Sequence, residues 1–140
     1  MKIRLSLLVL FAAACAFVAC SPQMSSNLQR QTEPAAHPDY AVVYLYRPSS
    51  YVATPYDVYI GTEKVYRSRK FTKQAVKLYK PGQYEIWAET ETKEVMPLDV
   101  ELGKDYYVRT GTTFGEEIWR PAFTIVSAAD GKGEWNAIRE

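Results

Sequence analysis

The sequence predicts an all-β domain, an antiparallel β-sandwich of about seven to eight short strands. From Tyr40 onward, short apolar or alternating runs are separated by turn residues about every eight to twelve positions. The chain contains 11 tyrosines, and tyrosine and the β-branched residues fit a half-buried, pleated surface. No segment of about ten residues or more has helical periodicity, so a short terminal helix is the only one that we expect.

The first nineteen residues have the layout of a secretory signal. "MKIR" is a short positive region, and the apolar stretch that follows it is shorter than the roughly twenty residues that a membrane span needs. The stretch ends in "FVAC", Phe17 to Cys20, which resembles the four-residue box of bacterial lipoproteins, with Phe17 in place of the usual leucine. The sequence therefore predicts a signal peptide over residues 1–19 and acylation of Cys20.

Lipidation of Cys20 would anchor the chain to a bilayer. Each buried CH₂ stabilises membrane binding by about 0.8 kcal/mol. One acyl chain therefore anchors a protein only marginally, whereas several chains, palmitate among them, anchor it firmly. The other interpretation is a structural cysteine, but its only partner, Cys15, would leave with the signal. In enterobacterial lipoproteins, an aspartate directly after the lipidated cysteine retains the protein at the inner membrane. Here Ser21 follows Cys20, so the resemblance favours the periplasmic side of the outer membrane.

Residues 20–39 form the predicted tether, because they are rich in Ser, Gln and Pro and offer almost nothing apolar to bury. The folded domain is predicted over residues 40–140. Its first run, "YAVVYLYRP", is apolar on both faces, which indicates a central buried strand that ends at Pro48. Two strands, Tyr56 to Ile60 and Lys64 to Ser68, are expected to meet at a tight turn around Gly61.

The second half of the domain continues this pattern. "FTKQAVKLY" and "QYEIWAET" are separated by Pro81-Gly82, which predicts a further hairpin. "EVMPLDVEL" places Met96, Leu98 and Val100 on one face, and Pro97 inside the run indicates an edge strand. "GKDYYVRTGT" and "PAFTIVS" supply two more strands, and "ADGKGEWNAIRE" is expected to form a turn and the short terminal helix.

These residues resemble a known family. The order "YLYRP", "VYIGTEKV", "LYKPGQYEIWAE" and "LDVELGKDYYVRTG" is similar to the bacterial lipoproteins grouped as domain of unknown function 2846, over about Tyr40 to Val126. Its most specific part is the segment from Gly103 to Arg109. The resemblance implies a small β-sandwich and no established activity. Thr62-Glu63-Lys64 stands where family members often place another glycine, so the geometry of that turn is expected to differ.

Composition argues against several classes of function. With 17 basic and 16 acidic side chains, the formal charge is +1, which gives no strong case for nucleic acid as a partner. The single histidine, His37, falls in the predicted tether, and no cysteine stays free after lipidation, so no thiol nucleophile or Cys/His metal site is expected. The many carboxylates are interpreted as solvated strand faces. We therefore expect no enzyme, no cofactor and no metal.

Four residues are candidates for binding. Arg47 and Arg109 each lie in a tyrosine-rich strand and could bring two guanidinium groups to one end of a sheet, although stacking on tyrosines would also explain them. Tyr51 lies in a predicted loop, where an exposed aromatic side chain has more value for recognition than for folding, and Trp119, which follows a Gly-Thr-rich loop, is a second such candidate. The leading hypothesis is a lipid-anchored, non-enzymatic envelope protein that binds another envelope protein or has a structural role. The alternative is a module that binds glycan or peptidoglycan.

Overall fold

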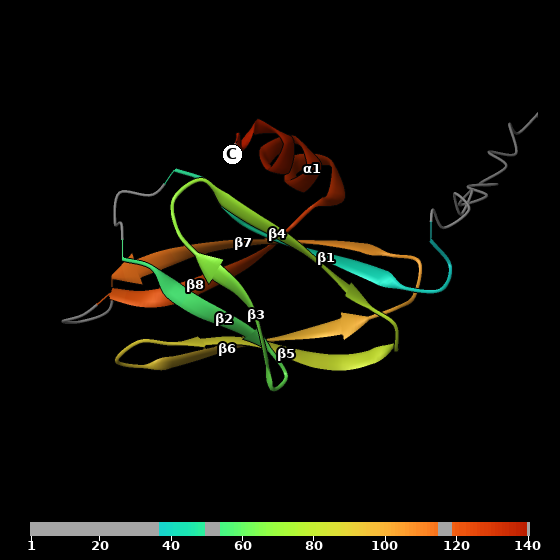
Figure 1. Ribbon diagram of the computed structural model, residues 1–140, viewed down its shortest axis with the longest axis horizontal. Helices are drawn as coiled ribbons and strands as arrows, with labels where there is room; N and C mark the ends of the chain where they lie inside the picture. The colour runs from blue at the N-terminus through green and yellow to red at the C-terminus, as the bar shows by residue number, and fades with distance from the viewer. Residues whose placement is uncertain (1–36, 50–53, 115–118, 140) are drawn as a thin grey trace, which may run out of the picture. The chain divides into compact units, whose positions relative to one another are not determined.

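The computed structural model describes residues 37–49, 54–114 and 119–139, all of them within one compact unit, Thr32–Glu140. Two four-stranded sheets pack face to face, with strand orders β4-β1-β7-β8 and β3-β2-β5-β6 (Figure 1). The elements are β1 (Ala41–Arg47), β2 (Tyr56–Ile60), β3 (Glu63–Ser68), β4 (Thr72–Leu78), β5 (Gly82–Glu89), β6 (Lys93–Val100), β7 (Asp105–Phe114), β8 (Trp119–Val126) and the helix α1 (Ala128–Ala137). The predicted β-sandwich with a short terminal helix is confirmed.

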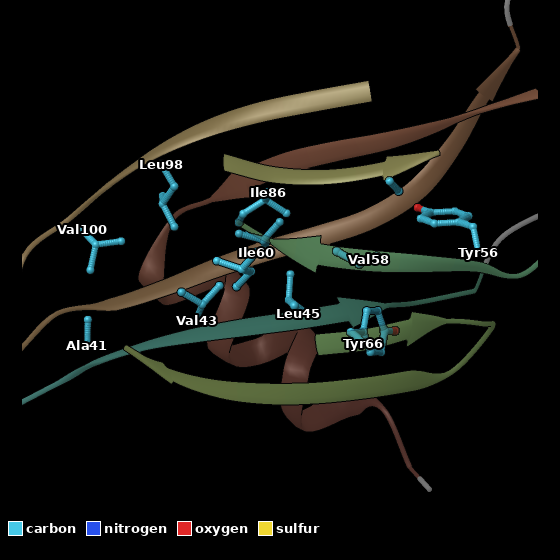
Figure 2. Packing of buried hydrophobic residues seen from close by; sticks show 12 residues of the cluster. Ala41, Val43, Leu45, Tyr56, Val58, Ile60, Tyr66, Ile86, Leu98 and Val100 are labelled. Carbon is cyan, nitrogen blue, oxygen red and sulfur yellow. The ribbon is translucent and has the colours of Figure 1, made fainter. Parts of the chain in front are cut away.

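Strand β1 lies between β4 and β7 and is buried on both faces, as its sequence predicts. Val43 and Leu45 point into the space between the sheets, while Tyr44 and Tyr46 point to the opposite face. Figure 2 shows the inner face of β1 meeting residues of β2, β5 and β6, among them Ile86, in one apolar cluster. Complete burial of such side chains stabilises a core by about 1.5–3 kcal/mol each.

One strand pair differs from the antiparallel prediction. β1 and β7 run parallel, in a register that places Tyr44 opposite Tyr107 and Tyr46 opposite Arg109, whereas the other pairs of described strands are antiparallel. Parallel neighbours need a long connection. Here the segment from β2 to β6 forms this connection. The sequence did not predict the parallel pair, because an alternating pattern of side chains is the same for both strand directions.

The hairpin predicted across Pro81-Gly82 is wrong. β4 pairs with β1 in one sheet, whereas β5 pairs with β2 and β6 in the other, so the chain turns a corner from sheet to sheet at this point. Gly82 has a φ of 137°, which side-chain-bearing residues rarely adopt. The Pro-Gly signal therefore marks a real turn, but the partner of the following strand comes from elsewhere. The edge position predicted for the strand that contains Pro97 is confirmed in β6.

Helix α1 covers the outer face of β1 and β7. Ser127 caps its first turn, accepting a hydrogen bond from the Asp130 backbone N–H at 3.2 Å. Trp135 lies edge-on to the Tyr44 ring at 5.0 Å, and Ile138, just past the helix, is 4% exposed in the same cluster. The helix contains two glycines, which lower its intrinsic propensity, so packing on the sheet must supply its stability.

Candidate functional site

The two candidate arginines do not meet. Arg109 lies opposite Tyr46, on the face of the sheet that α1 covers, whereas Arg47 follows Tyr46 and points to the other face. The Arg47 side chain is fully buried, donates a hydrogen bond to the Thr54 carbonyl at 2.9 Å and lies 5.5 Å from the Tyr56 ring. Its contacts connect the end of β1 to the start of β2. The two arginines therefore lie at the same end of the sheet but on opposite faces, so they do not form the joint binding surface that the sequence suggested.

Arg109 belongs to a network beneath α1. Its Nε donates to Glu134 at 2.8 Å, a second guanidinium nitrogen contacts the other carboxylate oxygen, and the Tyr46 hydroxyl donates to the same carboxylate at 2.9 Å. The hydrogen bonds from Arg109 lower the pKa of Glu134, and burial together with the Glu134 charge raises the pKa of Tyr46 to about 12. This bidentate pair joins helix to sheet, so Arg109 is engaged within the domain.

Trp119 begins β8 and forms an exposed pair with Phe114. The rings meet edge to face, with centroids 4.9 Å apart and planes at 63°, and Phe114 and Trp119 are 58% and 42% exposed. They close the β7–β8 hairpin, whose loop lies outside the described residues. Edge-to-face packing leaves ring surface open to a ligand. Two other sites named from the sequence, Cys20 and Tyr51, also fall outside the described residues.

A groove lies between the edge strands β6 and β8 of the two sheets, and one of its lining residues, Thr113, directly precedes Phe114. Its volume is about 310 Å³. Most of the lining is apolar, from Val95, Met96, Pro97, Pro121, Ala122 and Phe123, and Glu94 and Thr113 are the polar members. Such a lining suits apolar side chains better than sugar hydroxyls, which need several fixed hydrogen-bonding groups. This groove could not be predicted from the sequence, because it forms only where strands of two sheets meet.

A second aromatic cluster that the sequence did not indicate lies on the outer face of the other sheet. Tyr59 and Trp87 are direct cross-strand neighbours and stack with ring centroids 4.2 Å apart. The Lys93 ammonium lies 4.4 Å from the Trp87 ring, and the indole N–H donates to the Gly61 carbonyl at 2.7 Å. The indole is thus held by stacking, a cation and a hydrogen bond. Cross-strand stabilisation of this kind accounts for the cluster without a ligand.

His37, placed in the tether by the sequence, contacts the sandwich. Its Nδ1 lies 2.8 Å from the Tyr40 carbonyl oxygen, its Nε2 lies 2.9 Å from an Asp105 carboxylate oxygen, and its ring stacks on Tyr40. A neutral imidazole carries one N–H, whereas both nitrogens here face acceptors, so the site favours imidazolium. The Tyr40 carbonyl first, and then Asp105, raise the pKa of His37 above its usual 6.5.

We expect the titration of the single histidine to show this shift. In NMR spectra, the His37 midpoint should lie above 6.5, and Asp105→Asn should lower it. The sign follows from linkage: because the pKa is raised in the folded state, the contact stabilises the domain fully below the unfolded pKa, and the stabilisation is lost as pH rises through the folded pKa. As a control, Asp99→Asn removes an equal charge from a residue that His37 does not contact, so it should not lower the His37 midpoint as Asp105→Asn does. A wild-type midpoint at or below 6.5 would contradict the contact.

Within residues 37–49, 54–114 and 119–139, no group of three or more His, Cys, Asp or Glu side chains is arranged to hold a metal ion. Over the same residues, no helix has the length and apolar character that crossing a bilayer requires.

No family model matches this chain, and no curated protein matches it. The resemblance to domain of unknown function 2846 therefore stays a prediction. Among solved structures, the chain is similar to the N-terminal domain of AlgF from P. aeruginosa, with 19% sequence identity and a TM-score of 0.38. The match covers 64% of this chain and 95% of that one.

Proposed function

We propose that this protein is a lipid-anchored component of the bacterial cell envelope, held on the periplasmic side of the outer membrane by acylated Cys20. Its sandwich binds another envelope protein and catalyses no reaction. The anchor is supported by the signal-like N-terminus that ends in "FVAC" and by the polar segment that follows it. The binding role is supported by one observation above all, the apolar groove between β6 and β8.

The groove favours a protein partner over a glycan. Six of its eight lining residues are apolar, and the exposed Phe114 directly follows the lining residue Thr113. Interface centres are enriched in aromatic side chains and methionine and depleted of charge, which matches this composition. The glycan alternative draws on the open ring surface of the same aromatic pair, with Arg120 next to it in sequence.

The anchor is tested by labelling cells with radioactive palmitate. The wild-type protein is expected to carry the label and to sediment with membranes. Cys20→Ala should carry no label and either keep its signal or appear in the soluble fraction. Label on the Cys20→Ala protein would contradict acylation at this residue.

The partner class is tested by photo-crosslinking in cells. A photoreactive side chain at Val95, which lines the groove and is 46% exposed, should yield adducts of discrete mass. The matched control is Gln83, an exposed position on β5 that does not line the groove. Trp119→Ala should weaken the adducts from position 95. Equal adduct patterns at positions 95 and 83 would contradict a groove-bound protein.

Co-sedimentation with purified peptidoglycan sacculi separates the two proposals. The protein-partner proposal expects no sedimentation beyond the background without sacculi. Sedimentation that Trp119→Ala abolishes would instead favour the glycan module and place its site at the aromatic pair.

A further inference from the structure

The near-neutral net charge of the chain hides a strong separation of charge. Residues 64–80 carry seven basic side chains and no acidic one: Lys64, Arg67, Arg69, Lys70, Lys73, Lys77 and Lys80. Residues 81–101 carry six acidic side chains and one basic one: Glu85, Glu89, Glu91, Glu94, Asp99, Glu101 and Lys93. Two adjoining stretches of similar length thus have opposite charge.

In the folded domain, these two stretches lie on opposite sides of the sandwich. The basic stretch forms β3 and β4, which are the first strands in the two sheet orders and contact one another (Figure 1). The acidic stretch forms β5 and β6, and β6 lies at the opposite edge, beside β8 and the groove. The domain is therefore an electric dipole directed across its strands. Such a distribution orients a protein in an external field even when its net charge is small.

Four of the seven cations are engaged within the domain. Lys64 and Arg67 both pair with Asp57, and the Lys73 ammonium binds the carbonyl oxygen of Ile138 at 2.8 Å, beyond the end of α1. The Lys77 ammonium, although exposed, lies 4.4 Å from the centroid of the Tyr40 ring. The other three are Arg69, Lys70 and Lys80, all exposed, and none of them forms an ion pair with a described residue. Lysines on an edge strand protect it from pairing with other chains, which alone would explain their presence.

Edge protection does not explain the aromatic residues at both ends of β4. Phe71 immediately precedes the strand and is 53% exposed. Tyr79 immediately follows it and is 66% exposed, although its ring centroid lies 5.8 Å from that of Tyr40. Phe71 also has a φ of 58°, held by a hydrogen bond from its backbone N–H to the Arg47 carbonyl. This backbone conformation is rare for a bulky side chain, and glycine would adopt it freely. Phe71 borders a hollow together with Pro48 and Ile138, yet about half of its surface stays exposed. A half-exposed ring at a strained backbone position points to a role in addition to packing.

We propose that the β4 strip, defined as Arg69, Lys70, Phe71, Lys77, Tyr79 and Lys80, docks on the surface of a bilayer that contains anionic phospholipid. Basic side chains near such a surface are attracted to its headgroups, and aromatic rings partition into the membrane–water interface. The strip offers both kinds of side chain together, along one exposed edge of the fold. Charge complementarity and the flanking rings favour a lipid surface over a soluble polyanion, which would use the cations alone.

Docking through β4 would orient the domain for the proposed partner. β4 and β8 are the two outer strands of one sheet, so a domain that rests on β4 presents β8 and the adjoining groove away from the bilayer. The acidic strands β5 and β6 would also point away from the anionic surface, which the field of the membrane favours. The inference rests on electrostatics and exposure of the strip, and it does not require Cys20 to be acylated.

The test uses the chain from residue 20 onward with Cys20→Ser, so that no lipid anchor can contribute; this chain retains every described element. Co-sedimentation with vesicles is measured with about 30 mol% phosphatidylglycerol in phosphatidylcholine, and with phosphatidylcholine alone. We expect binding only to the anionic vesicles, and weaker binding when salt rises from about 50 mM to about 500 mM, because salt screens exposed charges. Lys70→Gln/Lys80→Gln should lower the partition coefficient about 25-fold, since each basic group near the surface contributes about fivefold.

Two controls separate docking from folding and from net charge. Lys93→Gln/Lys104→Gln removes the same two charges from the acidic stretch and the turn after it, and should leave vesicle binding unchanged or strengthen it. Phe71→Gly removes an exposed ring at a backbone position that suits glycine, so it should weaken vesicle binding without lowering the melting temperature.

Three results would overturn the proposal. The first is absence of binding to anionic vesicles at low salt, and the second is equal binding by the wild-type chain and Lys70→Gln/Lys80→Gln. The third is binding to soluble polyphosphate or to sacculi that depends on the strip while the vesicles are ignored, which would assign the strip to an anionic polymer. None of these results bears on the palmitate or crosslinking experiments, and sedimentation with sacculi that depends on the strip differs from the Trp119-dependent sedimentation expected of a glycan module. Failure of the docking proposal is therefore distinguishable from failure of the proposed function.

Discussion

Replacing Tyr107 by alanine is expected to lower the free energy of unfolding by about 3–5 kcal/mol, the usual cost of truncating a large buried aromatic side chain. The Tyr107 ring is 6% exposed, stacks on Tyr44 with centroids 4.6 Å apart, and lies beneath α1. Truncation would remove the surface on which the helix rests. Thermal unfolding should show a melting temperature lower by about 15 °C or more, given the usual scaling for a domain of this size.

Two variants make this expectation specific. Tyr107→Phe keeps the ring, so it should change the stability by less than about 1.5 kcal/mol, in the range of shape-conserving substitutions. Tyr79→Ala removes a ring that is 66% exposed, so it should change the free energy of unfolding by no more than about 0.5 kcal/mol. If Tyr107→Ala melted at the wild-type temperature, the ring would not form part of the packed layer under α1.

Strand positions could be predicted from the sequence because the signals for them are local. The run "YAVVYLYRP" alternates between two apolar faces and ends at a proline, and β1 occupies it. Pro97 inside a run predicted an edge strand, because a proline cannot donate to a ladder, and β6 is an edge. Each of these inferences uses residues within one strand length of one another.

Strand partners could not be predicted in the same way. Pro81-Gly82 marks a turn, but the same dipeptide can join two strands of one sheet or direct the chain into a second sheet. In this protein the chain enters the second sheet after the turn, because β5 pairs with β2 and β6, which both belong to that sheet. The parallel pairing of β1 with β7 is likewise invisible in the sequence, since the side-chain pattern of a strand is the same in both directions.

The candidate site was predictable only in part, for the same reason. Trp119 was found because an aromatic residue in a turn-rich segment has little reason to be buried. The separation of Arg47 from Arg109 depends on register: Arg109 lies opposite Tyr46, so the neighbouring Arg47 must point to the other face. The groove between β6 and β8 requires two strands from different sheets to be placed side by side, which no local pattern encodes.

The close approach of Gly131 in α1 to the sheet leads to the second large effect. Gly131 is buried, and a Cβ built on it would lie 2.3 Å from the Tyr107 Cβ and 2.4 Å from its Cγ. The Tyr107 Cβ is fixed by the backbone of β7, so no rotation of the side chain can move it away. Gly131→Ala should therefore force the helix off the sheet and destabilise the domain by about 1–3 kcal/mol, the range seen for overpacked cores.

The same substitution two residues later should have the opposite effect. A Cβ at Gly133 meets nothing within 4 Å, so Gly133→Ala gains helix propensity without a clash and should stabilise the domain by about 0.5–1 kcal/mol. The two variants share their composition and their helix, and they differ only in which face of the helix receives the methyl group. Urea unfolding of both would therefore separate packing from propensity. Equal stability of the two would mean that α1 does not approach β7 as closely as the contact at Gly131 implies, and Arg109–Glu134 would then be the main tie between helix and sheet.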